Sequence, residues 1–223
     1  MKTKLALKAT AFFLVGAAMV ALLLFLPAGT LTYPGAWRLM ALLFIPMFLM
    51  GVLLLFLAPE VLKKRLNSKE KMGDQKRIVG LSGVIFLLGF ILAGLDFRFG
   101  WSRVPGWLIA CASVVFLGSY VMYGEVMREN AWISRTVEIQ EGQQVVSTGL
   151  YGVVRHPMYL AASLMFTAIP LVLGSFVSFV VFLCYPFVLA ARIRSEEALL
   201  VKELDGYAAY REKVRYKMIP YIW

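Results

Sequence analysis

The sequence predicts an all-α, polytopic membrane protein: a bundle of about six transmembrane helices with a C-terminal helical hairpin and a cytoplasmic helical lid. Of the 223 residues, 61% are hydrophobic and 16% are charged, and the mean hydropathy is +0.76. This balance lies outside the usual range for soluble globular domains. Apolar runs of membrane-spanning length recur along the chain, and basic residues gather in alternate connections between them.

Six apolar segments are the predicted membrane helices. A helix needs about 20 apolar residues to cross a bilayer, within a range of roughly 17 to 25. The first run exceeds the apolar core of ~7 to 15 residues in a cleavable signal, so we expect it to remain as a helix. Only Gly174 and Ser175 separate the last two, short runs, which fits the tight turn of a helical hairpin. The segments are 5–26, 37–57, 78–95, 105–126, 158–173 and 176–191.

Basic residues predict the orientation independently, because Lys and Arg accumulate in cytoplasmic loops. With the N-terminus inside, only Arg38, Arg98 and Arg103 fall on the outer side, so both termini are expected in the cytoplasm. The net charge of +10 then reflects topology and contact with anionic membrane lipids, and no feature supports nucleic-acid binding. Before the basic tail, the inner residues are Lys2, Lys4, Lys8, Lys63, Lys64, Arg65, Lys69, Lys71, Lys76, Arg77, Arg128, Arg135 and Arg155.

The sequence predicts no metal site. His156 is the only histidine, and Cys111 and Cys184 have no metal-ligand spacing. Both cysteines fall within predicted helices, so we interpret them as small core residues. No glycine-rich phosphate loop is present.

Two clusters of ionisable residues stand at the ends of the predicted hairpin. Arg155 and His156 precede its first helix, and a run of charged residues, 192–197, leaves its second. Since a hairpin returns the chain to the side it left, both clusters are expected on the cytoplasmic face, where they can form one site. Ionisable groups near a membrane are costly and usually functional. Arg192 and Glu196 are four residues apart and share a helix face, whereas Glu197 points about 100° away.

Each residue also has a structural interpretation when taken alone. Arg155 can serve the charge asymmetry of the loops, and His156 can cap a helix. Arg192 with Glu196 can be an ordinary surface pair of small energetic value. The convergence of two ionic clusters on one hairpin favours a functional site.

Three blocks carry a family resemblance: TGLYGVVRHPMY at 148–159, RIRSEE at 192–197 and GYAAYREKVRYKMIP at 206–220. Their order and spacing resemble the integral-membrane methyltransferases of the isoprenylcysteine carboxyl methyltransferase family, within a superfamily that also contains phospholipid N-methyltransferases. The first four predicted helices contain no such motif. The chain is accordingly divided into an N-terminal four-helix membrane region, 1–126, and a C-terminal cofactor-binding and catalytic region, 127–223, within one integrated membrane domain.

The resemblance implies a site for S-adenosylmethionine that is built without a Rossmann domain. It implies catalytic roles for Arg192, which faces the methyl acceptor in the family, and for Glu196. The residues implied in cofactor binding are Gln143, Gln144, Val145, Val146, Tyr151, His156, Pro157, Met158, Tyr159, Glu196 and Glu197.

The chemistry of these side chains suits that cofactor. Glu196 can bind its α-ammonium, His156 can hydrogen-bond a polar edge, and an aromatic ring can lie against the adenine or the sulfonium. Arg192 can hold an acceptor carboxylate by two hydrogen bonds. We therefore expect carboxyl O-methylation of an isoprenylcysteine-type or similar lipophilic carboxylate that enters from the bilayer.

The tail is expected to cover the site from the cytoplasm. A helical pattern from 196 to 204 stops at Asp205 and Gly206, and a second helix resumes from 207. Three other functions stay open: a phospholipid N-methyltransferase, an NADPH-dependent sterol-type reductase, and a membrane scaffold without enzymatic activity.

Overall fold

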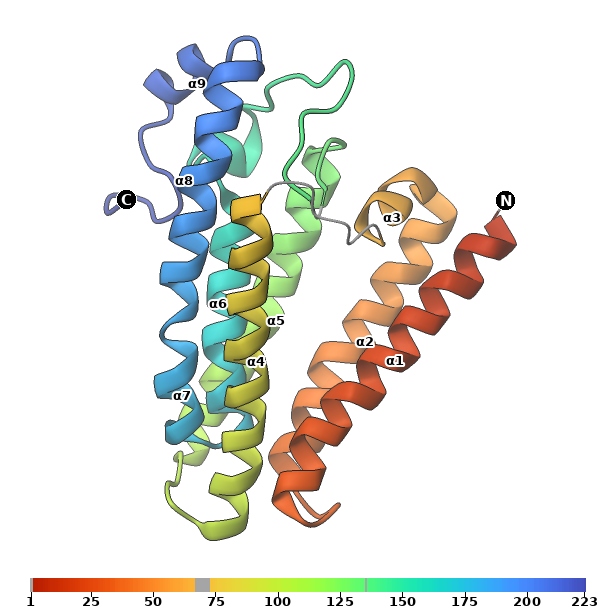
Figure 1. Ribbon diagram of the computed structural model, residues 1–223, viewed down its shortest axis with the longest axis vertical. Helices are drawn as coiled ribbons and strands as arrows, with labels where there is room; N and C mark the ends of the chain where they lie inside the picture. Colours follow the sequence, from red (N-terminus) through yellow and green to blue (C-terminus); the bar gives the residue numbers. More distant parts are fainter. Residues whose placement is uncertain (1, 67–72, 135) are drawn as a thin grey trace.

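A computed structural model describes residues 2–66, 73–134 and 136–223, and these form a helical bundle without strands (Figure 1). The α-helices run up and down along one common direction, with short helices at their ends. The fold class predicted from the sequence is confirmed. In chain order, the helices are α1 (Lys2–Ala28), α2 (Pro34–Leu57), α3 (Pro59–Arg65), α4 (Gly73–Phe99), α5 (Gly106–Glu129), the 3₁₀ helix η1 (Gly149–Gly152), α6 (Pro157–Leu173), α7 (Phe176–Phe182), α8 (Tyr185–Glu203) and α9 (Tyr207–Lys213).

Five of the six predicted apolar segments each coincide with one helix, apart from Pro105 just before α5, and the sixth, 176–191, is divided between α7 and α8 at Leu183 and Cys184. Five spans of the described chain are long and apolar enough to cross a membrane. These are α1, α2, α4, α5 and the combined stretch of α7 and α8, Phe176–Glu203. The remaining segment, α6, is apolar but has 17 residues. Since α6 is the first arm of the hairpin, the hairpin pairs one short helix with one longer, interrupted span.

The hairpin turn has the predicted residues in the predicted conformation. Gly174 has a φ of 86°, a left-handed conformation that glycine adopts without steric cost. The Ser175 hydroxyl accepts a hydrogen bond from the Ser178 amide at 3.0 Å and thereby caps α7. The same hydroxyl donates to Asp96, which also accepts from the Ser102 amide at 2.7 Å. The turn is thus fixed to the connection between α4 and α5.

Close helix contacts concentrate at this lower end of the bundle. A Cβ added at Gly35 would lie 2.2 Å from the Leu173 carbonyl oxygen, and one at Gly94 would lie 2.7 Å from that of Leu24. These glycines let α2 approach α6, and α4 approach α1, closely. Above these crossings α1 and α2 diverge from α4 and α8 (Figure 1). The largest hydrophobic cluster contains buried residues of α1, α2, α4, α5, α6 and α7.

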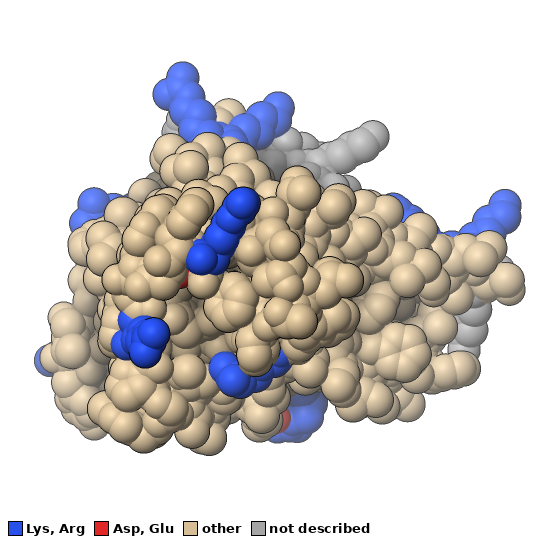
Figure 2. Space-filling model, turned by 90° about the horizontal axis from the view of Figure 1, so that it is seen from below, with Lys and Arg blue, Asp and Glu red and all other residues tan. Residues whose placement is uncertain are grey.

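The N-terminus, α3, the connection after α5, and α9 all lie toward the upper end in Figure 1. This agrees with the predicted alternation of the connections, while the membrane side that this end faces stays a prediction. The view from the opposite end shows a largely uncharged surface with separated Lys and Arg side chains (Figure 2). Of the basic residues used for the orientation, Lys69, Lys71, Arg135 and the Lys2 side chain lie outside the described residues.

The interpretation of the cysteines as core residues is wrong. Cys111 and Cys184 are both exposed on the surface of the bundle. A lipid-facing position is as apolar as a core position, so hydropathy does not separate the two.

Candidate functional site

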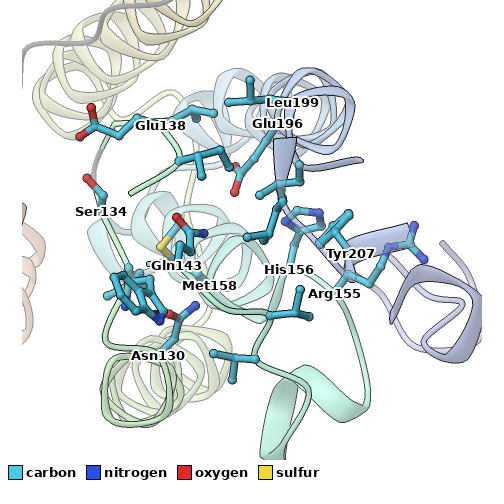
Figure 3. Close-up of a pocket in the computed structure, with 18 of the residues that line it drawn as sticks. Asn130, Ser134, Glu138, Gln143, Arg155, His156, Met158, Glu196, Leu199 and Tyr207 are labelled. Atoms are coloured by element: carbon cyan, nitrogen blue, oxygen red, sulfur yellow. Dashed lines mark hydrogen bonds between the residues drawn. The ribbon is translucent and has the colours of Figure 1, made fainter. Parts of the chain in front are cut away.

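A pocket lies at the upper end, between the long connection after α5 and the helices α6, α8 and α9 (Figure 3). The connection after α5 and the helices α6, α8 and α9 all supply lining residues, so segments far apart in sequence meet at this pocket. Its lining residues are Asn130, Trp132, Ile133, Ser134, Thr136, Val137, Glu138, Ile139, Gln143, Gln144, Val145, Val146, Tyr151, Arg155, His156, Met158, Tyr159, Arg192, Glu196, Leu199, Leu200, Leu204, Tyr207 and Tyr210.

The structure brings most of the sequence-predicted site residues together in this pocket. All of 143–146 line it, and so do both predicted catalytic residues, Arg192 and Glu196. The other predicted residues that line it are Tyr151, His156, Met158 and Tyr159. Pro157 and Glu197 are not among the lining residues. Pro157 instead begins α6, where a missing amide hydrogen costs nothing.

Tyr159 joins the two predicted catalytic residues. Its hydroxyl donates to Glu196 Oε2 at 2.5 Å and accepts a hydrogen bond from Arg192 Nε at 2.9 Å. Because α8 continues to Glu203, Arg192 and Glu196 lie one turn apart on the helix face that meets α6. A cation and an acid are therefore held side by side in the pocket wall through a shared hydroxyl.

Glu197 takes part in a buried ion pair behind this wall. Its Oε1 lies 2.6 Å from Arg155 Nε, and both side chains are almost fully buried. Its Oε2 lies 3.4 Å from Lys217 Nζ. Burying charges is tolerated only when they are paired and hydrogen-bonded. Glu197 thus contacts Arg155 and the C-terminal tail, and the cofactor contact that the resemblance implied for it stays a prediction.

Arg155 fastens the C-terminal tail to the start of α6. Its Nη1 donates to the carbonyl oxygens of Val214 and Arg215 at 2.7 and 2.9 Å. Its amide donates to the Tyr216 carbonyl, and the next amide, of His156, donates to the Lys217 carbonyl. Residues 214–217 of the tail therefore lie alongside Arg155 and His156 and are hydrogen-bonded to them.

His156 is held in place at the edge of the pocket. Its ring Nε2 lies 3.3 Å from Glu197 Oε1, and the residue is 5% exposed. Although His156 is the N-cap residue of α6, its side chain makes no capping hydrogen bond. The carboxylate fixes the ring orientation and leaves the imidazole facing the pocket as a polar group.

Tyr151 is anchored by both its hydroxyl and its backbone. The hydroxyl accepts from Asn130 Nδ2 at 2.8 Å, and the carbonyl oxygen accepts from the Tyr210 hydroxyl at 2.7 Å. Burial raises the pKa of Tyr151 to about 12, so the phenol is neutral at physiological pH. It contributes an aromatic face rather than a charge.

Several lining residues were missed by sequence reasoning. Asn130, Tyr207 and Tyr210 are examples: the GYAAY block marked the two tyrosines as part of the resemblance without a role. Among the described residues, no group of three or more His, Cys, Asp or Glu side chains is placed to hold a metal.

The N-terminal region contacts the connection that lines the pocket. Lys64 Nζ donates to the Ala131 carbonyl at 3.3 Å and lies 5.4 Å from the centre of the Trp132 ring. Arg65 Nη1 donates to the Ser134 carbonyl at 3.3 Å. Helix α3 thereby holds the first stretch of the connection that lines the pocket.

A search of curated proteins finds no match to this chain. A family model described as phospholipid methyltransferase matches residues 104–205. The matched stretch begins just before α5 and ends after α8, and it includes the hairpin, the RHP stretch and both members of the Arg192–Glu196 pair. Residues 104–205, slightly less than half of the chain, are therefore similar to the phospholipid methyltransferase family, within the superfamily to which the sequence resemblance pointed.

Proposed function

We propose that the protein transfers a methyl group from S-adenosylmethionine to a lipophilic acceptor at the membrane boundary, a carboxylate of the isoprenylcysteine type. The observation that supports this most directly is the hydrogen-bonded set of Arg192, Tyr159 and Glu196 in the pocket wall. In this set a carboxylate and a guanidinium lie next to each other, within the segment that matches the phospholipid methyltransferase model.

The residues of the pocket fit this cofactor, which supplies a methyl group on a sulfonium cation. Glu196 is the acid that would hold the α-ammonium, and His156 would hydrogen-bond a polar edge. Aromatic faces come from Tyr151 and Tyr159, and apolar surface comes from Val145 and Val146. Tyr207, which also lines the pocket, has a buried hydroxyl with no partner among the described residues. An acid, donors and aromatic faces are the set that such a ligand requires.

Arg192 would hold the methyl acceptor. Its guanidinium can bind a carboxylate through two hydrogen bonds and leave an oxygen lone pair free. A carboxylate is already ionised at neutral pH and releases no proton on methylation, so the site needs no general base. The chain's contribution is then orientation of the two reactants and exclusion of water.

N-methylation of an aminophospholipid is the second candidate, because the matching family model carries the phospholipid methyltransferase description. An amine acceptor has to lose a proton before or during methylation. Arg192 would be unfavourable beside the ammonium form, and would serve by binding the lipid phosphate instead. The two candidates therefore assign the same arginine to different parts of the acceptor.

The two reactants would reach the site from different sides. The lipophilic acceptor would enter from the bilayer between helices, and the cofactor from the cytoplasm beneath the tail. Membrane lipids are the surrounding partners.

A methyl-transfer assay with labelled S-adenosylmethionine tests the proposal on the purified full-length protein. Prenylated cysteine, fatty-acid and aminophospholipid acceptors are compared, and a methyl ester releases its label in base. We expect base-labile product from the prenylated carboxylate, with turnover reduced at least a hundredfold in Arg192→Gln. The control is Arg194→Gln, which removes the same charge at an exposed position two residues away. Base-stable product from the aminophospholipid would establish the second candidate, and no transfer to any acceptor would contradict both.

A further inference from the structure

Tyr207 lines the pocket and has a buried hydroxyl without a partner among the described residues. It is the first residue of α9 and follows Gly206, whose φ of 81° turns the chain out of α8. Tyr207 lines the pocket and is 4% exposed, and its hydroxyl oxygen has no hydrogen-bond partner among the described residues. A buried polar group in this state has lost its hydrogen bonds to water without a replacement, which is unfavourable. Buried hydroxyls in proteins are therefore almost always bonded, and an exception needs an explanation.

Packing does not explain this hydroxyl. The Tyr207 ring belongs to a small hydrophobic cluster with Tyr210, Val214 and Leu200, and a phenylalanine ring would fill the same space. The hydroxyl that attaches α9 to the rest of the site is that of Tyr210, through its bond to the Tyr151 carbonyl. Of the two buried side-chain atoms without a partner in the described chain, Gln75 Oε1 and Tyr207 Oη, only the second belongs to a pocket-lining residue.

The surroundings of Tyr207 define which ligand group it can meet. Burial raises the pKa of the phenol well above its usual range, and the charges of Glu197 and Glu196 raise it further. The hydroxyl keeps its proton and is a neutral donor. Figure 3 shows Tyr207 beside His156, on the side of the pocket where Glu196 also lies. A donor beside an acid suits a ligand that carries both an anion and a cation.

We propose that the Tyr207 hydroxyl donates a hydrogen bond to the carboxylate at the amino-acid end of S-adenosylmethionine. This inference rests on the function proposed above. The α-ammonium and the carboxylate are attached to the same carbon, so an ammonium held by Glu196 brings the carboxylate to the neighbours of Glu196. The hydroxyl oxygen is closed to solvent in the structure, so the side chains around it part when the ligand enters. The new bond then holds α9 over the bound ligand.

Two ligands and one variant test this role without an activity measurement. S-adenosylhomocysteine and 5′-methylthioadenosine share the adenosine thioether, but the second lacks the amino-acid group. Tyr207→Phe keeps the ring and removes the hydroxyl. We expect its affinity for S-adenosylhomocysteine to fall about tenfold, the usual effect of a lost bond to a charged group. Its affinity for 5′-methylthioadenosine should stay at the wild-type value.

Thermal unfolding of the ligand-free protein separates this role from a structural one. Tyr207→Phe should unfold at the same temperature as the wild type or higher, because it removes a buried polar atom without a partner. The matched control Tyr210→Phe loses a formed hydrogen bond, so it should unfold at a lower temperature and keep the wild-type ratio of the two ligand affinities.

Three results would overturn the assignment. In the first, the wild type binds S-adenosylhomocysteine and Tyr207→Phe binds both ligands with wild-type affinity. In the second, Tyr207→Phe loses affinity for both ligands equally, which places the hydroxyl away from the amino-acid end. In the third, the wild type binds neither ligand. This last result contradicts the proposed function itself, whereas the first two leave it standing.

Discussion

At the scale of single residues, neighbouring acids on α8 have separate tasks. Glu196 lies in the pocket wall and bonds to the Tyr159 hydroxyl, whereas Glu197 is buried against Arg155. One step along a helix rotates a side chain by about 100°, which is enough to move a carboxylate from the pocket to the protein interior. One acid is therefore available to a ligand, and the other stabilises the fold that forms the site.

Replacing Glu197 should mainly affect stability. Glu197→Gln preserves the side-chain volume but leaves the Arg155 guanidinium buried without its counter-charge. Removing one member of a buried ion pair destabilises by about 3 to 5 kcal/mol. We expect a markedly lower unfolding temperature in detergent. Cofactor affinity, measured at low temperature on the folded fraction, should stay near the wild-type value.

The matched control for that variant is Glu203→Gln, at an exposed position of the same helix. It should change stability by no more than about 0.5 kcal/mol. If Glu197→Gln unfolded at the same temperature as Glu203→Gln, the buried pair of Arg155 and Glu197 would not hold the tail as described.

At the scale of elements, the sequence predicts the helices better than the connections between them. Hydropathy locates every long helix, because an apolar run in a membrane protein has few alternatives to a helix. The helix ends extend further than predicted: α4 begins at Gly73 rather than at residue 78, since a helix can continue beyond its apolar part. The contribution of α3 could not be predicted, because no motif links it to the connection after α5.

The site likewise contains residues that the sequence predicts and contacts that it does not. Local blocks indicate Tyr151, His156, Arg192 and Glu196 because the chemistry and the helical spacing are visible in the sequence. The pairing of Arg155 with Glu197 joins residues 42 positions apart and has no local signal. Whether the Tyr207 hydroxyl has a hydrogen-bond partner depends on how α9 packs, and sequence spacing alone does not determine that packing.

Helix α3 should influence the pocket through its contacts with residues 131–134. In the double variant Lys64→Met/Arg65→Met, the bonds to the Ala131 and Ser134 carbonyls are lost. Because both positions are partly exposed, we expect the binding free energy of the cofactor to fall by about 1 kcal/mol in total, which is roughly fivefold weaker binding. Amide hydrogen exchange of residues 131–134 should also become faster.

The control is Lys63→Met, whose lysine pairs with Glu60 on the surface of the same helix. It should leave both the affinity and the exchange rates unchanged. Equal exchange rates in the double variant and the wild type would contradict the role given to α3.

At the scale of the whole molecule, the two ends of the bundle differ in construction. The lower end contains close helix crossings and the fixed hairpin turn. The upper end contains the pocket, the long connection after α5 and the tail. The closely packed end and the end with the pocket are thus opposite ends of one bundle, and the proposed function assigns both reactants to the end with the pocket.

Cysteine labelling in cells should establish which side the upper end faces. In a background without Cys111 and Cys184, single cysteines are introduced by Lys63→Cys and Lys213→Cys at the upper end, and by Thr30→Cys and Arg103→Cys at the lower end. An impermeant maleimide applied outside should label only the lower pair, and the upper pair should react after permeabilisation. The reverse pattern would contradict the predicted orientation, and a split within either pair would contradict the arrangement of the helices.

Equilibrium dialysis of labelled S-adenosylmethionine with the full-length protein measures whether the pocket binds this cofactor through Glu196, as proposed. Wild type should bind S-adenosylmethionine and not NADPH. Glu196→Gln should bind it at least tenfold more weakly, because a charge opposite the α-ammonium is lost. Arg192→Ala should bind it within about twofold of the wild type. Equal affinities of wild type and Glu196→Gln would contradict the role of Glu196, and binding of NADPH in place of S-adenosylmethionine would contradict methyl transfer altogether.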